Sequence, residues 1–145
     1  MLLMQRATAT DLPAVLELLE ANKLPTAGVQ DHLEHSRLEF AGDELIACAG
    51  LEIHGRAGLL RSVAVSEDHR STGLGKKLVQ AILEHAKAHH LSSISLLTET
   101  AQDYFPRFGF QITPRASLPE SLHASSEFRG ACPDSAIAMT LKFEH

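Results

Sequence analysis

The chain has 145 residues, 44% of them hydrophobic, and its 13 Lys and Arg against 18 Asp and Glu give a formal net charge of -5. A chain of this size can bury roughly two thirds of its unfolded surface, which is enough for one domain without a metal or disulfide staple. The acidic balance argues against a nucleic-acid partner, because general nucleic-acid binders present a basic face. There is no apolar run of about 18 residues and no basic leader, so we expect a cytoplasmic protein without membrane contact.

The first half of the chain predicts a strand, two helices and an antiparallel meander. A short apolar start leads to Thr10 or Asp11, which can cap a helix whose first turn tolerates Pro13. The polar stretch 29–35 predicts a second, short helix. Turn signals separate three apolar runs, which predict strands over 38–41, 45–53 and 59–65.

The second half predicts a crossover and a closing strand. Helical periodicity covers 73–89 and a compact apolar strand covers 94–97, which at this spacing indicates a right-handed parallel connection. A short helix is expected over 102–108, then a strand at 110–112, an irregular tract over 114–133 and a final strand over 136–143. No linker or repeat divides the chain, so we expect one α/β domain over residues 1–145 with a mixed sheet.

The most informative segment is 62–78, where an apolar strand passes through a polar turn into an amphipathic helix. Gly73 and Gly75 open that helix, where unpaired backbone N–H groups and the helix dipole favour a phosphate. The Walker pattern would need Gly at position 70, and the dinucleotide fingerprint would need Gly or Ala at 78, so neither fits. The alternative is that the two glycines merely relax a loop before a surface helix.

The pattern Arg-x-x-Gly-x-Gly at residues 70–75 resembles the signature of the GNAT family of N-acetyltransferases. The segments 60–65 and 104–110 and the start of the chain are also similar to that family, so the resemblance spans roughly residues 5–112. It implies a GNAT fold, with a splayed, mostly antiparallel sheet flanked by helices, and acetyl-CoA as co-substrate. It also implies that the cofactor is bound by Val63, Ala64, Val65, Arg70, Ser71, Thr72, Gly73, Leu74, Gly75 and Lys76.

Acetyl transfer to an amine needs a base for the nucleophile, an oxyanion donor and a proton for the departing thiolate. In much of the family a tyrosine gives that proton, but Phe105 occupies the matching position, which leaves the adjacent Tyr104 as the candidate acid or as a residue packed on the sheet. Leu59 likewise stands where many members have a glutamate. The remaining candidates for the base are Glu52, His54, Glu99 and Glu127, and a solvated surface position is the alternative for each carboxylate.

Arg61 is an unusual charge in an apolar strand. Strict alternation places Leu60, Ser62 and Ala64 on one face, and Arg61, Val63 and Val65 on the other. Arg61 could grip a substrate carboxylate with its planar fork, or it could form a structural ion pair. The run 60–65 resembles amino-acid N-acetyltransferases such as N-acetylglutamate synthase domains.

Two further segments, 24–29 and 126–136, are similar to a GNAT subgroup associated with arsenic-resistance operons. This resemblance implies that Cys132 and Glu127 lie near the acceptor, although one cysteine without a paired ligand is weak evidence for binding arsenic. The spacing of His85 and His89 suits a metal, but position 86 is not Glu, so we expect a solvated helix face and no metal.

These observations together predict an N-acetyltransferase that acts on a small-molecule amine, with an amino acid or a related carboxylate-bearing compound as the first candidate. The expected chemistry is direct attack of the amine on acetyl-CoA in a ternary complex. The alternatives are a non-catalytic acetyl-CoA-binding sensor or accessory protein, and a peptide or protein N-acetyltransferase. The apolar final strand is compatible with a homodimer.

Overall fold

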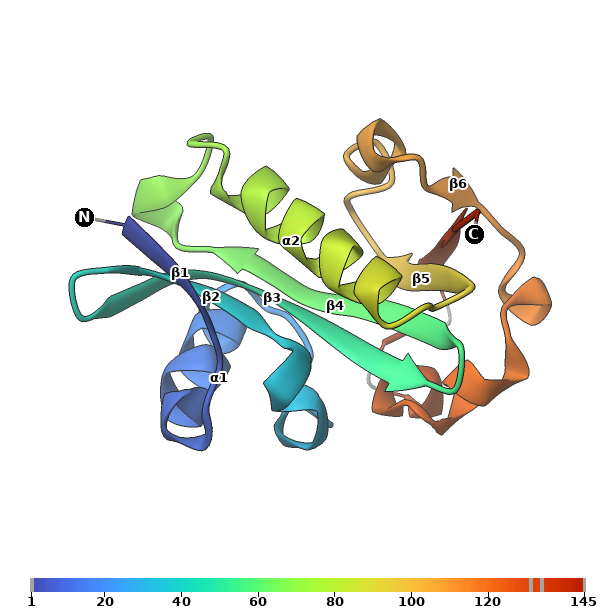
Figure 1. The fold of residues 1–145 in the computed structure, drawn as a ribbon, viewed down its shortest axis with the longest axis horizontal. Coiled ribbons are helices and arrows are strands. Elements are labelled where there is room, and N and C mark those ends of the chain that lie inside the picture. The colour runs from blue at the N-terminus through green and yellow to red at the C-terminus, as the bar shows by residue number, and fades with distance from the viewer. Residues whose placement is uncertain (1, 131, 134, 145) are drawn as a thin grey trace.

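The chain forms a seven-stranded sheet in the computed structural model, which describes residues 2–130, 132–133 and 135–144. Its strand order is β1-β2-β3-β4-β5-β7-β6, and the β4–β5 pair is parallel while the other neighbours are antiparallel (Figure 1). The strands are β1 (Leu2–Arg6), β2 (Arg37–Ala41), β3 (Glu44–His54), β4 (Ala57–Val65), β5 (Ser93–Thr98), β6 (Gln111–Ile112) and β7 (Ile137–Lys142). This mixed, mostly antiparallel sheet confirms the predicted α/β class.

Two helices cover opposite faces of the sheet (Figure 1). Helix α1 (Leu12–Ala21) begins directly after Asp11, one of the two predicted caps, and Pro13 occupies its first turn. The Asp11 carboxylate accepts a hydrogen bond from the Thr8 backbone N–H at 2.8 Å, which caps the preceding 3-10 turn η1 (Ala9–Asp11). Helix α2 (Leu74–Ala88) connects β4 to β5 and buries a stripe at i, i+4 spacing. That stripe consists of Leu74, Leu78, Ile82 and Ala86. The helix order and the crossover are therefore as the periodicity indicates.

Apolar side chains form a core on each face. Leu51, Leu60, Ile94 and Leu96 of the strands pack with the buried stripe of α2. On the opposite face, residues of α1 and of the 3-10 turn η2 (Gln30–His35) pack against β2 and β3. None of the described helices has the length and apolar character needed to cross a membrane.

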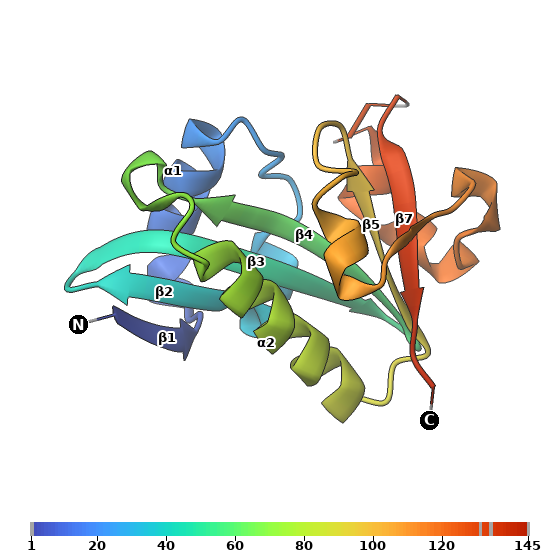
Figure 2. The same ribbon diagram turned by 90° about the horizontal axis from the view of Figure 1, so that it is seen from above.

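Strands β4 and β5 separate after a short paired stretch. Their parallel pairing runs from Ala57–Ser93 to Leu59–Ser95, and beyond it the two strands diverge in a V (Figure 2). The expected splay is therefore present. It leaves the β5-facing edge of β4 after Leu60 open for a ligand within the described part of the chain.

A β-bulge in β4 overturns the strict alternation expected for this strand. Gly50 pairs with Arg61 and Cys48 with Ala64, so β4 has one extra residue, and Ser62 takes up a φ of +60°. Because a bulge reverses the inside–outside order, Leu60 lies on the α2 face together with Val63 and Val65, while Ala64 packs with Cys48 on the α1 face. Arg61 therefore does not share a face with the two valines.

The short helices differ from the prediction. Residues 102–108 contain only the 3-10 turn η4 (Phe105–Phe108), which ends at Gly109 with a φ of +100°. The predicted helix over 29–35 is the 3-10 turn η2. The irregular tract over 114–133 contains three 3-10 turns, η5 (Arg115–Ser117), η6 (Glu120–Ala124) and η7 (Ser126–Arg129). Prolines at the start of several of these turns suit such short elements.

Candidate active site

Two adjoining cavities follow the open edge of β4. One, of about 440 Å³, lies at the start of α2, and the other, of about 530 Å³, lies between β4 and β5 where they diverge. Val63 and Tyr104 line both, so the two cavities adjoin, and together they are called the groove. A groove that joins a helix N-terminus to a deeper chamber suits a long ligand with a phosphate at one end.

The first cavity lies at the turn that the sequence predicts to bind phosphate. Ser71, Gly73, Leu74, Gly75 and Lys76 line it, together with Val63 and Val65. Helix α2 has no side-chain cap at Gly73, so the N–H groups of its first turn remain available to an anion. The turn holds Ser71 at a φ of +67°, a conformation that costs a non-glycine residue of order 1–3 kcal/mol and clusters at functional sites.

Three of the predicted cofactor residues are not among the described residues that line this groove. The Arg70 guanidinium is instead bound to two residues of the groove wall: it donates to the Asn22 side chain at 2.8 Å and to the Val65 carbonyl at 3.3 Å. The Thr72 hydroxyl donates to the His69 carbonyl, and Ala64 faces the α1 core. Arg70 and Thr72 thus shape the turn.

The groove instead has a cation that the sequence motif did not identify. Arg107 lines the phosphate cavity and lies 4.2 Å from the centre of the Tyr104 ring. Its Nε donates to the Tyr104 carbonyl at 2.7 Å, which fixes the side chain at the mouth. His69 also lines this cavity. Neither residue belongs to the motif, so only their position in the fold reveals them.

Tyr104 lies at the junction of the two cavities. A Cβ placed on Gly75 would be 3.4 Å from its hydroxyl, so the phenol is directed at the start of α2 rather than into the deeper chamber. Burial raises the pKa of Tyr104, against the opposing effect of Arg107, and the phenol therefore stays protonated at neutral pH. The neighbouring Phe105 is buried in the core on the α2 face.

The deeper cavity brings together several residues that the sequence indicated. Arg61, Glu127, Cys132 and the candidate base Glu99 line it, along with the loop after α1 and the end of β5. The side chain of Glu52 is 1% exposed and does not line the cavity. The loop after α1 contributes Asn22, Lys23, Leu24 and Pro25, and β5 and the residues after it contribute Leu96, Leu97, Thr98, Glu99, Thr100 and Ala101.

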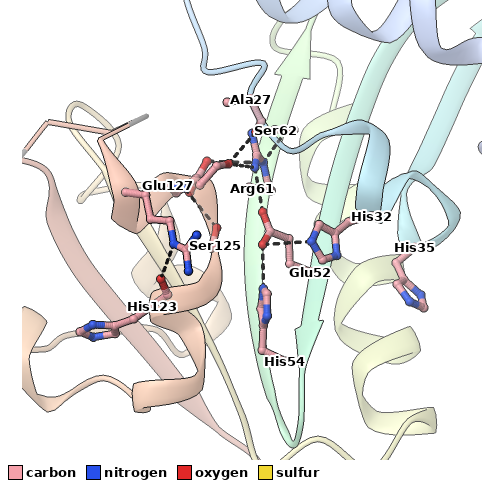
Figure 3. Close-up of polar contacts among 12 residues, drawn as sticks. Ala27, His32, His35, Glu52, His54, Arg61, Ser62, His123, Ser125 and Glu127 are labelled. Atoms are coloured by element: carbon pink, nitrogen blue, oxygen red, sulfur yellow. Dashed lines mark hydrogen bonds and ion pairs between the residues drawn. The ribbon is translucent and has the colours of Figure 1, made fainter.

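Arg61 connects the cavity to a buried polar network (Figure 3). Its Nη1 donates to Glu52 at 2.7 Å, and its Nε lies 3.5 Å from Glu127. Its Nη2 donates to the Pro25 carbonyl at 3.2 Å, and further contacts reach Ser62 and Ser126. Each guanidinium nitrogen thus has a protein partner, which is the structural ion pair that the sequence left open.

The pKa values of the two carboxylates beside Arg61 are shifted in opposite directions. Burial raises the pKa of Glu127 to about 7, although the Arg61 charge opposes the shift. Burial would also raise the pKa of Glu52, but hydrogen bonds from Arg61 and His54 outweigh it and lower the pKa. Glu127 can therefore exchange a proton near neutral pH, whereas Glu52 stays ionised.

Cys132 lies beside Glu127 as a protonated thiol. Burial and the neighbouring carboxylate raise the pKa of Cys132 to about 12. A thiol nucleophile reacts as its thiolate, so Cys132 is unsuited to covalent catalysis.

The chain is similar in sequence to two amino-acid acetyltransferases. The amino-acid acetyltransferase of Pasteurella multocida is 30% identical over 125 residues, which covers 79% of this chain and 28% of that protein. The amino-acid acetyltransferase of Escherichia coli K12 is 31% identical over 128 residues, again 28% of its length. The chain therefore spans little more than a quarter of these curated relatives.

A solved structure shows the same fold. N-acetylglutamate synthase from Neisseria gonorrhoeae, complexed with coenzyme A and N-acetyl-glutamate, superposes with a TM-score of 0.83 at 19% identity, over 100% of this chain and 36% of that one. The model of the acetyltransferase (GNAT) family matches residues 9–110. This match covers strands β2 to β5, the turn before α2 and helix α2 itself, and with the sequence relatives it shows that the chain belongs to the GNAT acetyltransferase family.

Proposed function

We propose that this protein transfers the acetyl group of acetyl-CoA to the primary amine of an amino acid or a related small, carboxylate-bearing compound. The observation that carries the proposal is a groove of two adjoining cavities, with the glycine turn at the start of α2 at one end and Glu127, whose pKa is raised to about 7, at the other. The names of the sequence relatives and the N-acetyl-glutamate complex support an amino-acid acceptor.

The cofactor would lie along the groove with its pyrophosphate at the start of α2. The N–H groups after Gly73, the Lys76 ammonium and Arg107 would bind the phosphates, and Tyr104 would cover the pyrophosphate. The pantetheine arm would run along the open β4 edge past Val65 and Val63. The thioester then reaches the bulge at Ser62, where backbone N–H groups can stabilise the oxyanion.

Glu127 is the residue we assign as general base. An amino group arrives largely as ammonium at neutral pH and must lose a proton before it can attack the thioester carbon. The Glu127 carboxylate takes that proton. As the tetrahedral intermediate collapses, a second proton passes from nitrogen to the thiolate, whose pKa of about 8.5 makes it a good leaving group without an obligatory acid.

A thiol-release assay with acetyl-CoA and a panel of free amino acids tests the proposal. We expect release of coenzyme A with at least one amino acid, and a product heavier by one acetyl group in mass spectrometry. The Gly75→Asp variant is the matched control for groove-dependent turnover. Saturable acetyl-CoA binding without release across amino acids and other amines would instead support the non-catalytic sensor.

A further inference from the structure

Two imidazoles and a carboxylate converge behind the deeper cavity. Glu52 and His54 stand two residues apart on β3 and so point to the same face, and His32 approaches from η2 (Figure 3). The Nε2 atoms of His54 and His32 lie 2.7 and 3.4 Å from the same Glu52 oxygen, Oε1. One ligand atom from each of the three residues lies within 4.8 Å of the others.

We propose that His32, Glu52 and His54 bind a divalent transition-metal ion of the borderline class to which Zn²⁺ belongs. Two imidazoles and one carboxylate are a common ligand set for such ions, and a set of three leaves a position for water. Tetrahedral zinc with bonds of about 2.0–2.1 Å places neighbouring ligand atoms about 3.3 Å apart. The His32–Glu52 distance already matches, and the His54–Glu52 distance has to widen by about 0.6 Å.

Metal binding requires the imidazole protons to lie on Nδ1, and each imidazole can meet this requirement while it keeps its one proton. His54 donates its Nε2 hydrogen to the ionised Glu52 in the metal-free protein. To ligate through Nε2, each imidazole carries its proton on Nδ1 instead. The side chains of His32 and His54 are 26% and 13% exposed, so water can carry the proton and an ion can enter.

The surrounding charges favour this set over the second histidine cluster. Glu52 offers Oε1 to the ion while Oε2 stays with Arg61, whose own charge is balanced in part by Glu127. The other cluster consists of His35, His85 and His89. There the Arg37 guanidinium lies 2.9 Å from His85 Nδ1, which places a positive charge against any bound cation.

The proposed ion would cross-link two segments that are distant in sequence. It would tie η2 to β3 and thereby fix the Glu52 carboxylate that holds Arg61. An ion that binds the folded chain alone raises the melting temperature in a concentration-dependent way. This proposal differs from the expectation of no metal, which rested on the His85 and His89 pair.

The test uses the full chain without a polyhistidine tag, titrated with Zn²⁺ by calorimetry and with Co²⁺ by visible absorption. We expect saturation at one equivalent, a higher melting temperature with Zn²⁺, and Co²⁺ bands of a histidine- and carboxylate-ligated ion. The His32→Ala variant should bind Zn²⁺ at least about tenfold more weakly, because even the loss of a residue that only hydrogen-bonds to a metal ligand lowers metal affinity by that factor. The matched control, His89→Ala, should bind as the wild type does.

Several outcomes would overturn the proposal. Absence of saturable binding to the wild type would do so, as would equal affinity in a folded His32→Ala variant. Loss of binding in His89→Ala would move the site to the second cluster. The His54→Ala variant should also weaken binding, but it removes a partner of a buried carboxylate, so circular dichroism must first show that this variant is folded. If His54→Ala is unfolded, the test rests on His32→Ala, which replaces the more exposed ligand.

Discussion

Arg61 separates two buried carboxylates, and its side chain is itself 3% exposed. Arg61→Ala would leave Glu52 and Glu127 without their counter-charge, so we expect it to lower the free energy of unfolding by about 3–5 kcal/mol. Urea denaturation of the variant measures the loss. Arg61→Lys keeps the charge but not the fork and should lose less. Unchanged stability with a raised acceptor KM would instead favour a substrate-gripping role.

Glu127→Gln removes the proposed base while it keeps the shape of the side chain. We expect kcat to fall about 10²- to 10⁴-fold with unchanged acetyl-CoA affinity. Because the pKa of Glu127 is raised to about 7, the carboxylate form that accepts a proton grows as the pH rises through 7, and kcat/KM should rise with it. The variant should lose that inflection. Wild-type rates in a folded Glu127→Gln enzyme would reject the assignment.

For individual residues, the sequence indicated sites made by neighbouring residues but not contacts between residues that are distant in the chain. The motif singled out Gly73, Gly75 and Lys76, which line one cavity because they are nearly consecutive residues of one turn. It could not show that Arg70 turns to Asn22, nor that Arg107 enters the groove, because both depend on contacts between distant segments. Arg61 and its two carboxylates come from β3, β4 and η7, and no spacing rule joins them.

Among the elements, the start of α2 is the proposed binding site of the acetyl-CoA pyrophosphate. The Gly75 position opens toward the groove, where a Cβ would meet only ordinary contacts from Tyr104 and Val65. Gly75→Asp should therefore fold, yet abolish acetyl-CoA binding, because its carboxylate faces the pyrophosphate. Calorimetric titration of acetyl-CoA measures this.

The control for that substitution lies on the same helix. Gln80 is exposed on α2 and away from the groove, and Gln80→Asp adds the same negative charge. We expect this variant to bind acetyl-CoA as the wild type does. If both variants bind equally well, the pyrophosphate does not lie at the start of α2.

The long elements were predicted from their local apolar pattern. Helix α2 has helical periodicity over its 15 residues, whereas most of the 11 residues of strand β3 belong to one continuous apolar run. The bulge at Ser62 was not predicted because one extra residue does not alter the composition of the strand, although it exchanges the faces of every later residue in β4. The 3-10 turns were not predicted because they are too short to show a periodic apolar pattern.

The whole molecule divides along the splay of the sheet. Strands β1 to β4 form one side and β5 to β7 the other, and β-pairing between β4 and β5 comprises three residue pairs. The groove occupies the opening between the two sides, with walls from both. A ligand there replaces the strand contacts that β4 and β5 do not make with each other, so cofactor binding and sheet rigidity should be coupled.

Hydrogen exchange followed by mass spectrometry measures that coupling. We expect saturating acetyl-CoA to slow amide exchange in β4 beyond Leu59 and in the second half of β5, because the cofactor shields the open edge. Exchange in β1 and β2, which do not line the groove, should change little. Gly75→Asp should show no slowing, which separates cofactor binding from non-specific effects. Protection confined to the start of α2 would mean that the pantetheine arm does not follow β4. That result would contradict the assignment of Val63 and Val65 as contacts of the arm.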